Sequence, residues 1–223
     1  MPIHPDRILW EDDAFLAVSK LPRELVVKGS GPVQRLPLLD FLKKDYPGLR
    51  PANRLDFETS GVVLFAKTKA ALEAAIAQQK AGEWAKTYRT LVAGYVKADR
   101  GEIAKPLPAR TGKGDAHALT RYRVLERFAG VTSLEAEIIT GRHHQIRRHF
   151  SLIGNPLVLD HVYGEEKFNR AFAHEFRYHH FFLHAFSLAF PHPFTGDKVR
   201  VEAKLPMAFE EVLGKLRGIQ HEK

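Results

Sequence analysis

The sequence predicts an α+β fold in which helices dock on a mixed, mostly antiparallel sheet. Several segments alternate apolar and polar residues with a period of two, which is typical of half-buried strands. Two of them, 121–128 and 132–140, are separated only by a short turn at Ala129-Gly130 and predict an antiparallel pair. Other segments have the spacing of amphipathic helices. Antiparallel strands covered by helices define the α+β class.

The first elements are predicted from turn residues and composition. Residues 8–10 and 14–20 flank an acidic turn and predict a hairpin. Three prolines and two glycines make 21–37 mostly loop, and 38–44 predicts a short amphipathic helix that stops before Pro47-Gly48. The polar stretch 54–60 then precedes Gly61 and the apolar run 62–67, which predicts a loop leading into a buried strand.

A helix is predicted after this strand. Thr68 has the side chain of a good N-cap, and Gly82 is a natural helix stop. Between them Leu72, Ile76 and several alanines are expected to form the buried face.

The remaining elements follow from the same signals. Strands are predicted at 86–96, 121–128, 132–140, 181–190 and 198–205, and helices at 144–154 and 207–218. The segment 105–118 has neither period and predicts a flexible, basic insertion.

Composition narrows the class of protein. Hydrophobic residues make up 44% and charged residues 27%, which is ordinary for a globular protein. No apolar run approaches the roughly 18 residues of a membrane span, and no secretory signal is evident, so we expect a cytoplasmic protein with no membrane partner. The absence of cysteine excludes disulfides and thiolate metal sites.

The charge balance favours a polyanionic partner. Lys and Arg number 34 against 26 for Asp and Glu, which gives a net charge of +8. Basic side chains that neutralise phosphates release condensed counterions, and this drives binding to nucleic acids. A basic surface also serves solubility, so composition alone does not decide between the two.

A first candidate site lies at residues 53–61, Asn-Arg-Leu-Asp-Phe-Glu-Thr-Ser-Gly. Asp56 stands in a polar loop before a buried strand, where it is suited to act as a nucleophile or base. Arg54 is suited to bind phosphate or to fill the gap left by a flipped base. Loops contain many such residues, so these nine residues alone carry little weight.

A second candidate site is the segment 141–149. A strand ends and a helix begins within it, which places Arg142 and His144 at a positive helix N-terminus, a natural anion site. Arg147 and Arg148 point about 100° apart on that helix and should have different roles. The histidine spacing misses the i, i+4 pattern of a zinc pair, so no metal is expected.

Tyr88 stands on a predicted strand beside Lys86 and Arg89. It is either a half-buried aromatic of the sheet or a platform for an unpaired base, with Lys86 as a phosphate ligand. The motifs of phosphate loops, dinucleotide-binding folds and serine hydrolases are missing.

Four segments together resemble the RluA family of pseudouridine synthases. RLDFETSGVVLFAKT is similar to its aspartate motif, KTYRTLVAGYV to its tyrosine strand, TGRHHQIRRHFSLIGNPLVLDHVYG to its arginine motif and FFLHAFSLAFPHPFTG to its closing strand. They occur in family order between residues 53 and 196. The sequence departs from the family at Asn53, where His is usual, at His143, where Thr or Ser is usual, and at Leu159, where Gly is usual.

The resemblance implies the pseudouridine synthase catalytic fold and isomerisation of uridine in a structured RNA, with no cofactor. It implies that Asp56 starts the reaction, that Arg147 pairs with Asp56, that Tyr88 stacks on the target uracil and that Arg54 enters the RNA as the base flips. RNA contacts are further expected from Asn53, Lys86, Arg142 and His144.

The substrate is expected to be transfer RNA, as in the TruC-like branch, with ribosomal RNA as the alternative. We expect a monomer that forms a single catalytic domain over residues 1–223, without an N-terminal accessory domain, so that loops such as 105–118 select the RNA. Two other functions stay open: a catalytically silent RNA-binding protein on the same scaffold, and a carboxylate-based nucleoside hydrolase.

Overall fold

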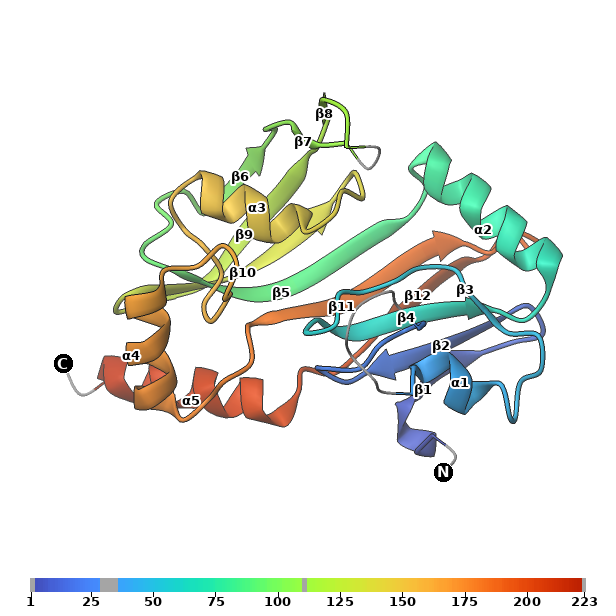
Figure 1. The fold of residues 1–223 in the computed structure, drawn as a ribbon, viewed down its shortest axis with the longest axis horizontal. Coiled ribbons are helices and arrows are strands. Elements are labelled where there is room, and N and C mark those ends of the chain that lie inside the picture. Colours follow the sequence, from blue (N-terminus) through green and yellow to red (C-terminus); the bar gives the residue numbers. More distant parts are fainter. Residues whose placement is uncertain (1–2, 29–35, 110–111, 222–223) are drawn as a thin grey trace. The chain divides into compact units, whose positions relative to one another are not determined.

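The computed structural model describes residues 3–28, 36–109 and 112–221. The chain forms two compact units (Figure 1). Unit 1 comprises residues 1–86 and 185–204, and unit 2 comprises residues 87–184 and 205–223. The chain changes unit within two strands, β5 (Ala85–Ala93) and β11 (Leu183–Pro191).

Unit 1 is built on a sheet with the strand order β1-β2-β4-β11, in which β3 lies beside β4 and β12 beside β11. Its other strands are β1 (Ile8–Glu11), β2 (Phe15–Lys20), β3 (Arg50–Pro51), β4 (Ser60–Ala66) and β12 (Lys198–Glu202). The pairs β1–β2, β2–β4, β3–β4 and β11–β12 are all antiparallel. The predicted first hairpin and the predicted final pair of strands are therefore confirmed.

Both faces of this sheet are buried, which explains why β2 and β4 are almost entirely apolar. On β2, Phe15 and Ala17 belong to one core cluster, and Leu16 and Val18 belong to another. The second cluster includes the leucines of α1 (Leu38–Leu42). A short 3₁₀ helix at Pro5–Arg7 precedes β1. Successive side chains of a strand point to opposite faces, so an all-apolar strand needs cover on both sides.

Helix α2 (Lys69–Ala81) covers the first of these clusters (Figure 1). Its boundaries are as predicted: the Thr68 hydroxyl accepts a hydrogen bond from the Ala71 amide at 3.1 Å, and Gly82 ends it with φ +76°. The predicted buried face is wrong in one respect, because Ala71 and Ala75 are buried whereas Ile76 is 41% exposed. Alanine leaves room for the helix backbone to lie close to the sheet.

Unit 2 has the strand order β5-β10-β9-β6. Besides β5, this sheet contains β6 (Arg100–Ile103), β9 (Thr120–Phe128) and β10 (Val131–Ile138). The helices of unit 2 are α3 (Gln145–Leu152), α4 (Glu166–Phe176) and α5 (Met207–His221). Strand β9 pairs antiparallel with β10 through the predicted turn, where Gly130 has φ +81°. Helix α4 was not predicted. The predicted α+β class and the mostly antiparallel sheet are confirmed.

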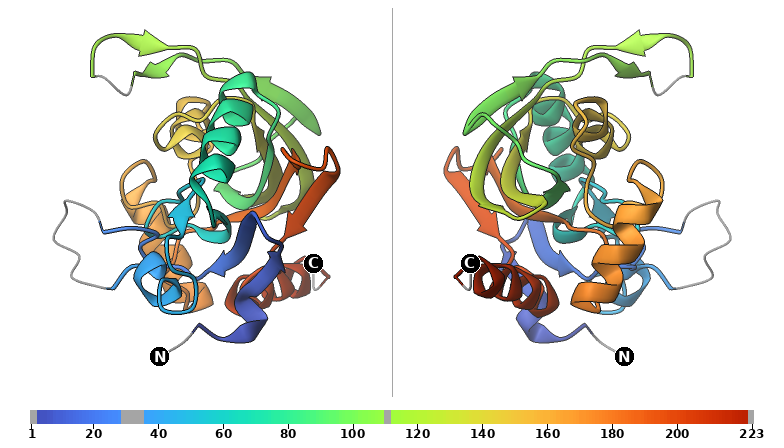
Figure 2. Two further views of the ribbon diagram at one scale, coloured as in Figure 1. Left: turned by 90° about the vertical axis from the view of Figure 1, so that its right-hand side faces the viewer. Right: turned by 90° about the vertical axis from the view of Figure 1, so that its left-hand side faces the viewer.

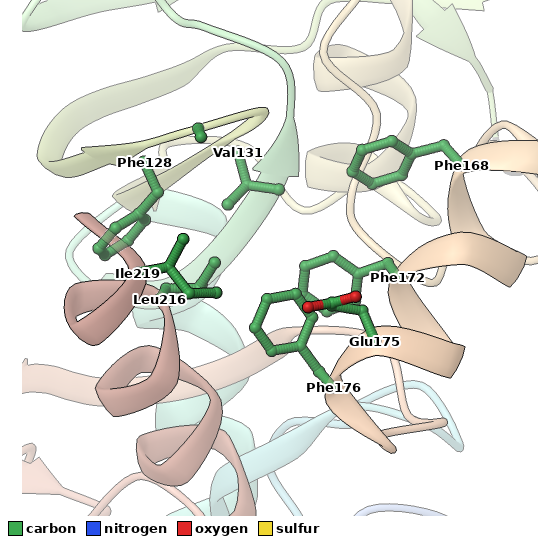
Figure 3. A pocket seen from close by; sticks show the side chains of 9 residues that line it. Phe128, Val131, Phe168, Phe172, Glu175, Phe176, Leu216 and Ile219 are labelled. Carbon is green, nitrogen blue, oxygen red and sulfur yellow. The ribbon is translucent and has the colours of Figure 1, made fainter. Parts of the chain in front are cut away.

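The core of unit 2 is rich in phenylalanine, and part of it lines a pocket of about 280 Å³. The pocket lies between α4, α5 and the β9–β10 turn (Figure 3), and its lining includes Phe128, Phe172, Phe176, Leu216 and the carboxylate of Glu175. None of the predicted site residues lines this pocket, so its walls give no support to a catalytic role.

In the segment predicted as a flexible insertion, the described residues form a small hairpin, which we call the arm (residues 105–109 and 112–118). Strands β7 (Leu107–Pro108) and β8 (Asp115–Ala116) pair antiparallel within it. The arm stands away from the sheet of its own unit (Figure 2). Arg110 and Thr111, part of a basic stretch expected to contact phosphate, lie outside the described residues.

No helix in the described part of the chain has both the length and the apolar character that a membrane crossing requires.

Candidate active site

Asp56 lies in unit 1, on the loop that connects β3 to β4 (residues 52–59, the Asp56 loop). Its side chain is half-buried, and its main-chain oxygen accepts a hydrogen bond from the Thr59 amide at 3.1 Å, which closes a tight turn. The loop therefore presents a carboxylate from the end of a buried strand, as the sequence predicts.

Asn53 fixes the upstream end of this loop to β4. The Leu64 amide donates to Asn53 Oδ1 at 2.7 Å, and Asn53 Nδ2 donates to the Val62 oxygen at 3.4 Å. The preceding rung, from the Ala52 amide to the Leu64 oxygen, is 2.8 Å long. The carboxamide thus extends the β3–β4 ladder by one rung, with an oxygen and an N–H placed like those of a peptide group. Asn53 therefore acts as a structural tie between the Asp56 loop and β4.

Lys20 fixes the downstream end of the loop. Its ammonium, on a side chain only 1% exposed, donates to three main-chain oxygens: Leu21 at 2.9 Å, Phe57 at 2.9 Å and Thr59 at 2.6 Å. Burial lowers the pKa of Lys20 to about 8, against the opposing effect of nearby carboxylates that include Asp56. The site therefore contains a buried cation that holds two main-chain oxygens downstream of Asp56, those of Phe57 and Thr59.

The other residues of the segment 53–61 either support the fold or lie at the surface. Gly61 has φ +116°, and a Cβ there would lie 2.2 Å from the Ala185 oxygen, so only glycine fits. Glu58 lies 3.6 Å from the Arg23 guanidinium. Arg54 is exposed, as a residue that meets an RNA must be.

Arg147 lies in unit 2 on α3 and is held by a carboxylate that the sequence reasoning missed. Its Nε and Nη2 donate to Asp160 at 2.6 and 2.8 Å in a two-pronged pair that is almost fully buried. The guanidinium carbon lies 5.1 Å from the ring centre of Tyr163 and 4.9 Å from that of Phe181. A planar guanidinium fixed in this way cannot be replaced by lysine without loss of geometry.

Asp160 is itself strongly held. Burial raises its pKa, but the Arg147 guanidinium and the amides of Val162 and Tyr163 outweigh burial, so the pKa lies below its usual value. The turn that presents it includes Leu159, which has φ +62° and is 1% exposed. This left-handed backbone is one that glycine adopts without cost and that a residue with a Cβ adopts under strain.

The N-terminus of α3 is partly occupied by its own residues. Gln145 Oε1 accepts hydrogen bonds from the Arg142 amide at 3.0 Å and from the Thr140 hydroxyl at 2.7 Å. Arg142 is half-buried, and its Nε donates to the His117 oxygen at 3.0 Å. His144 adopts φ +53°, and its ring stacks on that of His143 with centres 3.7 Å apart. An anion at the N-terminus of α3 would therefore meet the side chains of Arg142, His143 and His144 more than free main-chain N–H groups.

The two cations beside Tyr88 on β5, Lys86 and Arg89, both interact with other residues of the protein. Tyr88 is half-buried and packs against the core of unit 2. Lys86 is half-buried, its Nζ donates to Gln79 Oε1 at 3.0 Å, and burial lowers its pKa to about 8. Arg89 forms an ion pair with Glu135 at 3.0 Å. Lys86 and Arg89 thus each have a protein partner, which weakens the idea of a phosphate-binding cluster at 86–89.

Two supporting residues, Lys20 and Asp160, carry no distinctive local signal. Lys20 follows a strand like any surface lysine, and Asp160 follows an apolar run like the end of any strand. Only the fold brings Lys20 to the loop of residues 52–59, which lies more than thirty residues further along the chain.

Comparisons with known proteins place the chain in a family. A family model described as RNA pseudouridylate synthase matches residues 14–152. The chain is 34% identical over 218 residues to Ribosomal large subunit pseudouridine synthase C of Vibrio cholerae, covering 94% of this chain and 69% of that protein. It is likewise 34% identical over 225 residues to the protein of the same name from Escherichia coli, covering 96% and 70%.

Solved structures agree on the fold. The human protein RNA Pseudouridylate Synthase Domain Containing 4 superposes with a TM-score of 0.80 at 23% identity, covering 95% of this chain and 93% of that one. RNA Pseudouridylate Synthase Domain Containing 1, also human, gives 0.71 at 26% identity, covering 97% and 98%. The first of these shows the fold alone.

The family model, the relatives and the fold thus lead to one conclusion: the chain belongs to the RNA pseudouridylate synthase family and is an isomerase that converts uridine to pseudouridine in RNA.

Proposed function

We propose that the protein isomerises a uridine of large-subunit ribosomal RNA, with Asp56 as the residue that acts on the nucleotide. The observation that carries the role of Asp56 is the way its loop is fixed on both sides, by the side-chain rung of Asn53 and by the buried ammonium of Lys20. A reacting carboxylate must be held to within a fraction of an ångström, and fixing both ends of its loop supplies this.

The reaction balances without a cofactor. The N1–C1′ bond of uridine breaks, the uracil turns, and a C5–C1′ bond forms; the proton leaves C5 and N1 gains one. Asp56 is the carboxylate proposed to start this sequence as nucleophile or base. The proposal gives Arg147 the role of the cation that acts with Asp56 and Tyr88 that of the ring that stacks on the uracil.

The names of the relatives favour ribosomal RNA over the transfer RNA that the sequence suggested. Both relatives above are named for the large ribosomal subunit, and together with the family model they support RNA as the substrate class. We further propose that Arg54, Arg142 and His144 contact the RNA. Arg54 is exposed, and Arg142 and His144 are half-buried.

Unmodified transcripts of large-subunit ribosomal RNA and of transfer RNA, labelled with tritium at uridine C5, test the proposal directly. Wild-type protein should release tritium from the ribosomal transcript and leave pseudouridine at one mapped position. Asp56→Asn should release none, because the amide is neither anionic nor basic, while RNA binding persists.

Glu58→Gln is the matched control, since it removes a carboxylate from the same loop, and it should keep its activity. Activity in Asp56→Asn would refute the role of Asp56. Pseudouridine in transfer RNA alone would overturn the choice of substrate but not of reaction. Release of free uracil would show a hydrolase instead.

A further inference from the structure

The arm depends for its position on the elements at its base. Its two short strands share only the pairs Leu107 with Ala116 and Pro108 with Asp115. A two-stranded ribbon of this size is marginal by itself in water. Most of its described residues are exposed, including Lys113 and His117.

Helix α3 and the loop before it hold both legs of the arm. On the first leg, His149 Nε2 lies 2.9 Å from the Lys105 oxygen, and Lys105 Nζ donates to the Leu152 oxygen at 3.1 Å. On the second leg, Arg142 bonds the His117 oxygen at 3.0 Å, and Gln145 Nε2 bonds the Leu119 oxygen at 2.9 Å.

His149 is the innermost of these contacts, because its side chain is 0% exposed. The Lys105 oxygen can only accept, so Nε2 carries the proton. Burial lowers the pKa of His149, which favours the neutral imidazole. Nδ1, 2.9 Å from the Thr120 hydroxyl, then accepts from it, and the same hydroxyl accepts from Gln145 at 3.0 Å. Both ring nitrogens are thus used, one beside each leg of the hairpin.

The same helix carries Arg147. Residues two apart on a helix point about 200° apart, so His149 and Arg147 use opposite sides of α3. Arg147 bonds Asp160, and His149 bonds the base of the arm. The same helix therefore connects the base of the arm to the ion pair of Arg147 and Asp160.

We propose, on the basis of the function proposed above, that His149 is a positioning residue that couples RNA bound by the arm to Arg147. An RNA that extends far enough to contact the arm then fixes α3 and promotes turnover. The arm in this way selects among substrates at the catalytic step and not only at binding.

His149→Leu is the test variant, because it removes both hydrogen bonds and keeps an apolar side chain in the buried site. His149→Gln keeps an N–H able to reach the Lys105 oxygen and should restore part of the function. Thr132→Val is the matched control: Thr132 is also 0% exposed and also makes two hydrogen bonds, but to Gly94 and Val96 and not to the arm.

An armless variant completes a double-mutant cycle. Ile103 and Thr120 are cross-strand partners, so an Asn-Gly turn in place of residues 105–118 should close the β6–β9 hairpin. With ribosomal transcript, His149→Leu and the armless variant should each lower kcat about tenfold, and the double variant little further, because coupled sites are not additive. KM should change less than kcat in His149→Leu.

Hydrogen exchange gives a readout that needs no substrate. Amides of the arm and of Leu119 should lose protection in His149→Leu, regain it in part in His149→Gln and keep it in Thr132→Val. Unchanged protection in His149→Leu would show that His149 does not hold the base of the arm, and additive losses in kcat would refute its coupling to Arg147. A wild-type protein inactive on every RNA would refute the proposed function instead. Hydrogen exchange would then still decide whether His149 holds the arm.

Discussion

Leu159 offers a sharp test of the backbone that presents Asp160, because two opposing effects meet at one residue. Its side chain is 1% exposed, so truncation to Ala should cost about 2–5 kcal/mol in lost burial and cavity formation. Its φ of +62° is a conformation that costs a residue with a Cβ about 1 kcal/mol or more relative to Gly.

Leu159→Gly should therefore destabilise the protein by about 1–4 kcal/mol, less than Leu159→Ala, although Gly leaves the larger cavity. At an ordinary position the order is the reverse, since Gly is less stable than Ala by about 0.5–1 kcal/mol. Urea unfolding of both variants, followed by circular dichroism, measures the free energies of unfolding.

Leu157 is the matched control for this comparison. It is also 1% exposed and bridges to Val92 as extended backbone, so Leu157→Ala should be more stable than Leu157→Gly. If Leu159→Ala proved as stable as Leu159→Gly, the left-handed backbone at Leu159 would hold no strain that glycine relieves.

Four further predictions concern the site. Arg147→Lys should lower kcat by a factor of about one hundred or more, because a two-pronged pair is lost, whereas Arg142→Lys should act mainly on RNA affinity; steady-state kinetics separate them, and the opposite pattern would mean that the wrong arginine was chosen. Asp160→Asn should destabilise the protein by about 3–5 kcal/mol, since it leaves the buried Arg147 uncompensated, and an unfolding free energy within about 1 kcal/mol of wild type would contradict this. Tyr88→Phe should keep RNA affinity while Tyr88→Leu loses it, as base stacking is worth about 1–3 kcal/mol; equal filter-binding constants for Leu and wild type would remove the stacking role. Burial lowers the pKa of His149 below 6.5, so its contribution to stability should be complete above about pH 6.5 and decline as the pH falls below that; unfolding free energies of wild type and His149→Leu should converge on acidification, and parallel pH profiles would exclude His149 as the cause.

The sequence predicts strands and helix ends well wherever the signal is local. The cap at Thr68, the stop at Gly82 and the turn at Ala129-Gly130 are set by neighbouring residues, and the structure confirms all three. Helix α4 was missed because its residues follow turn-like ones, and the exposed Ile76 was misplaced because the closeness of a helix to a sheet is a tertiary property.

In the candidate site, too, the features set by local sequence were predicted and those set by tertiary packing were not. The Asp56 loop and the arginine helix are recognisable from contiguous motifs. The residues that hold them, Lys20 and Asp160, are not, because each acts through atoms far away in the sequence or through burial that no short segment encodes. The arm illustrates the same limit, since its composition is that of a loop while its base is hydrogen-bonded to residues of α3 such as His149.

The path of the chain has a consequence for the order in which the protein is made. Unit 1 contains residues 1–86 and 185–204, so a ribosome must translate all of 87–184 before β11 and β12 reach β4. At about 5–20 residues per second this delay is on the order of 10 s. Throughout it, the nascent first unit lacks Leu188, Phe190 and Val201 from its core and exposes an apolar strand edge. Unit 2 lacks only its final helix by then, so we expect the early-synthesised half to be the part that needs protection from aggregation.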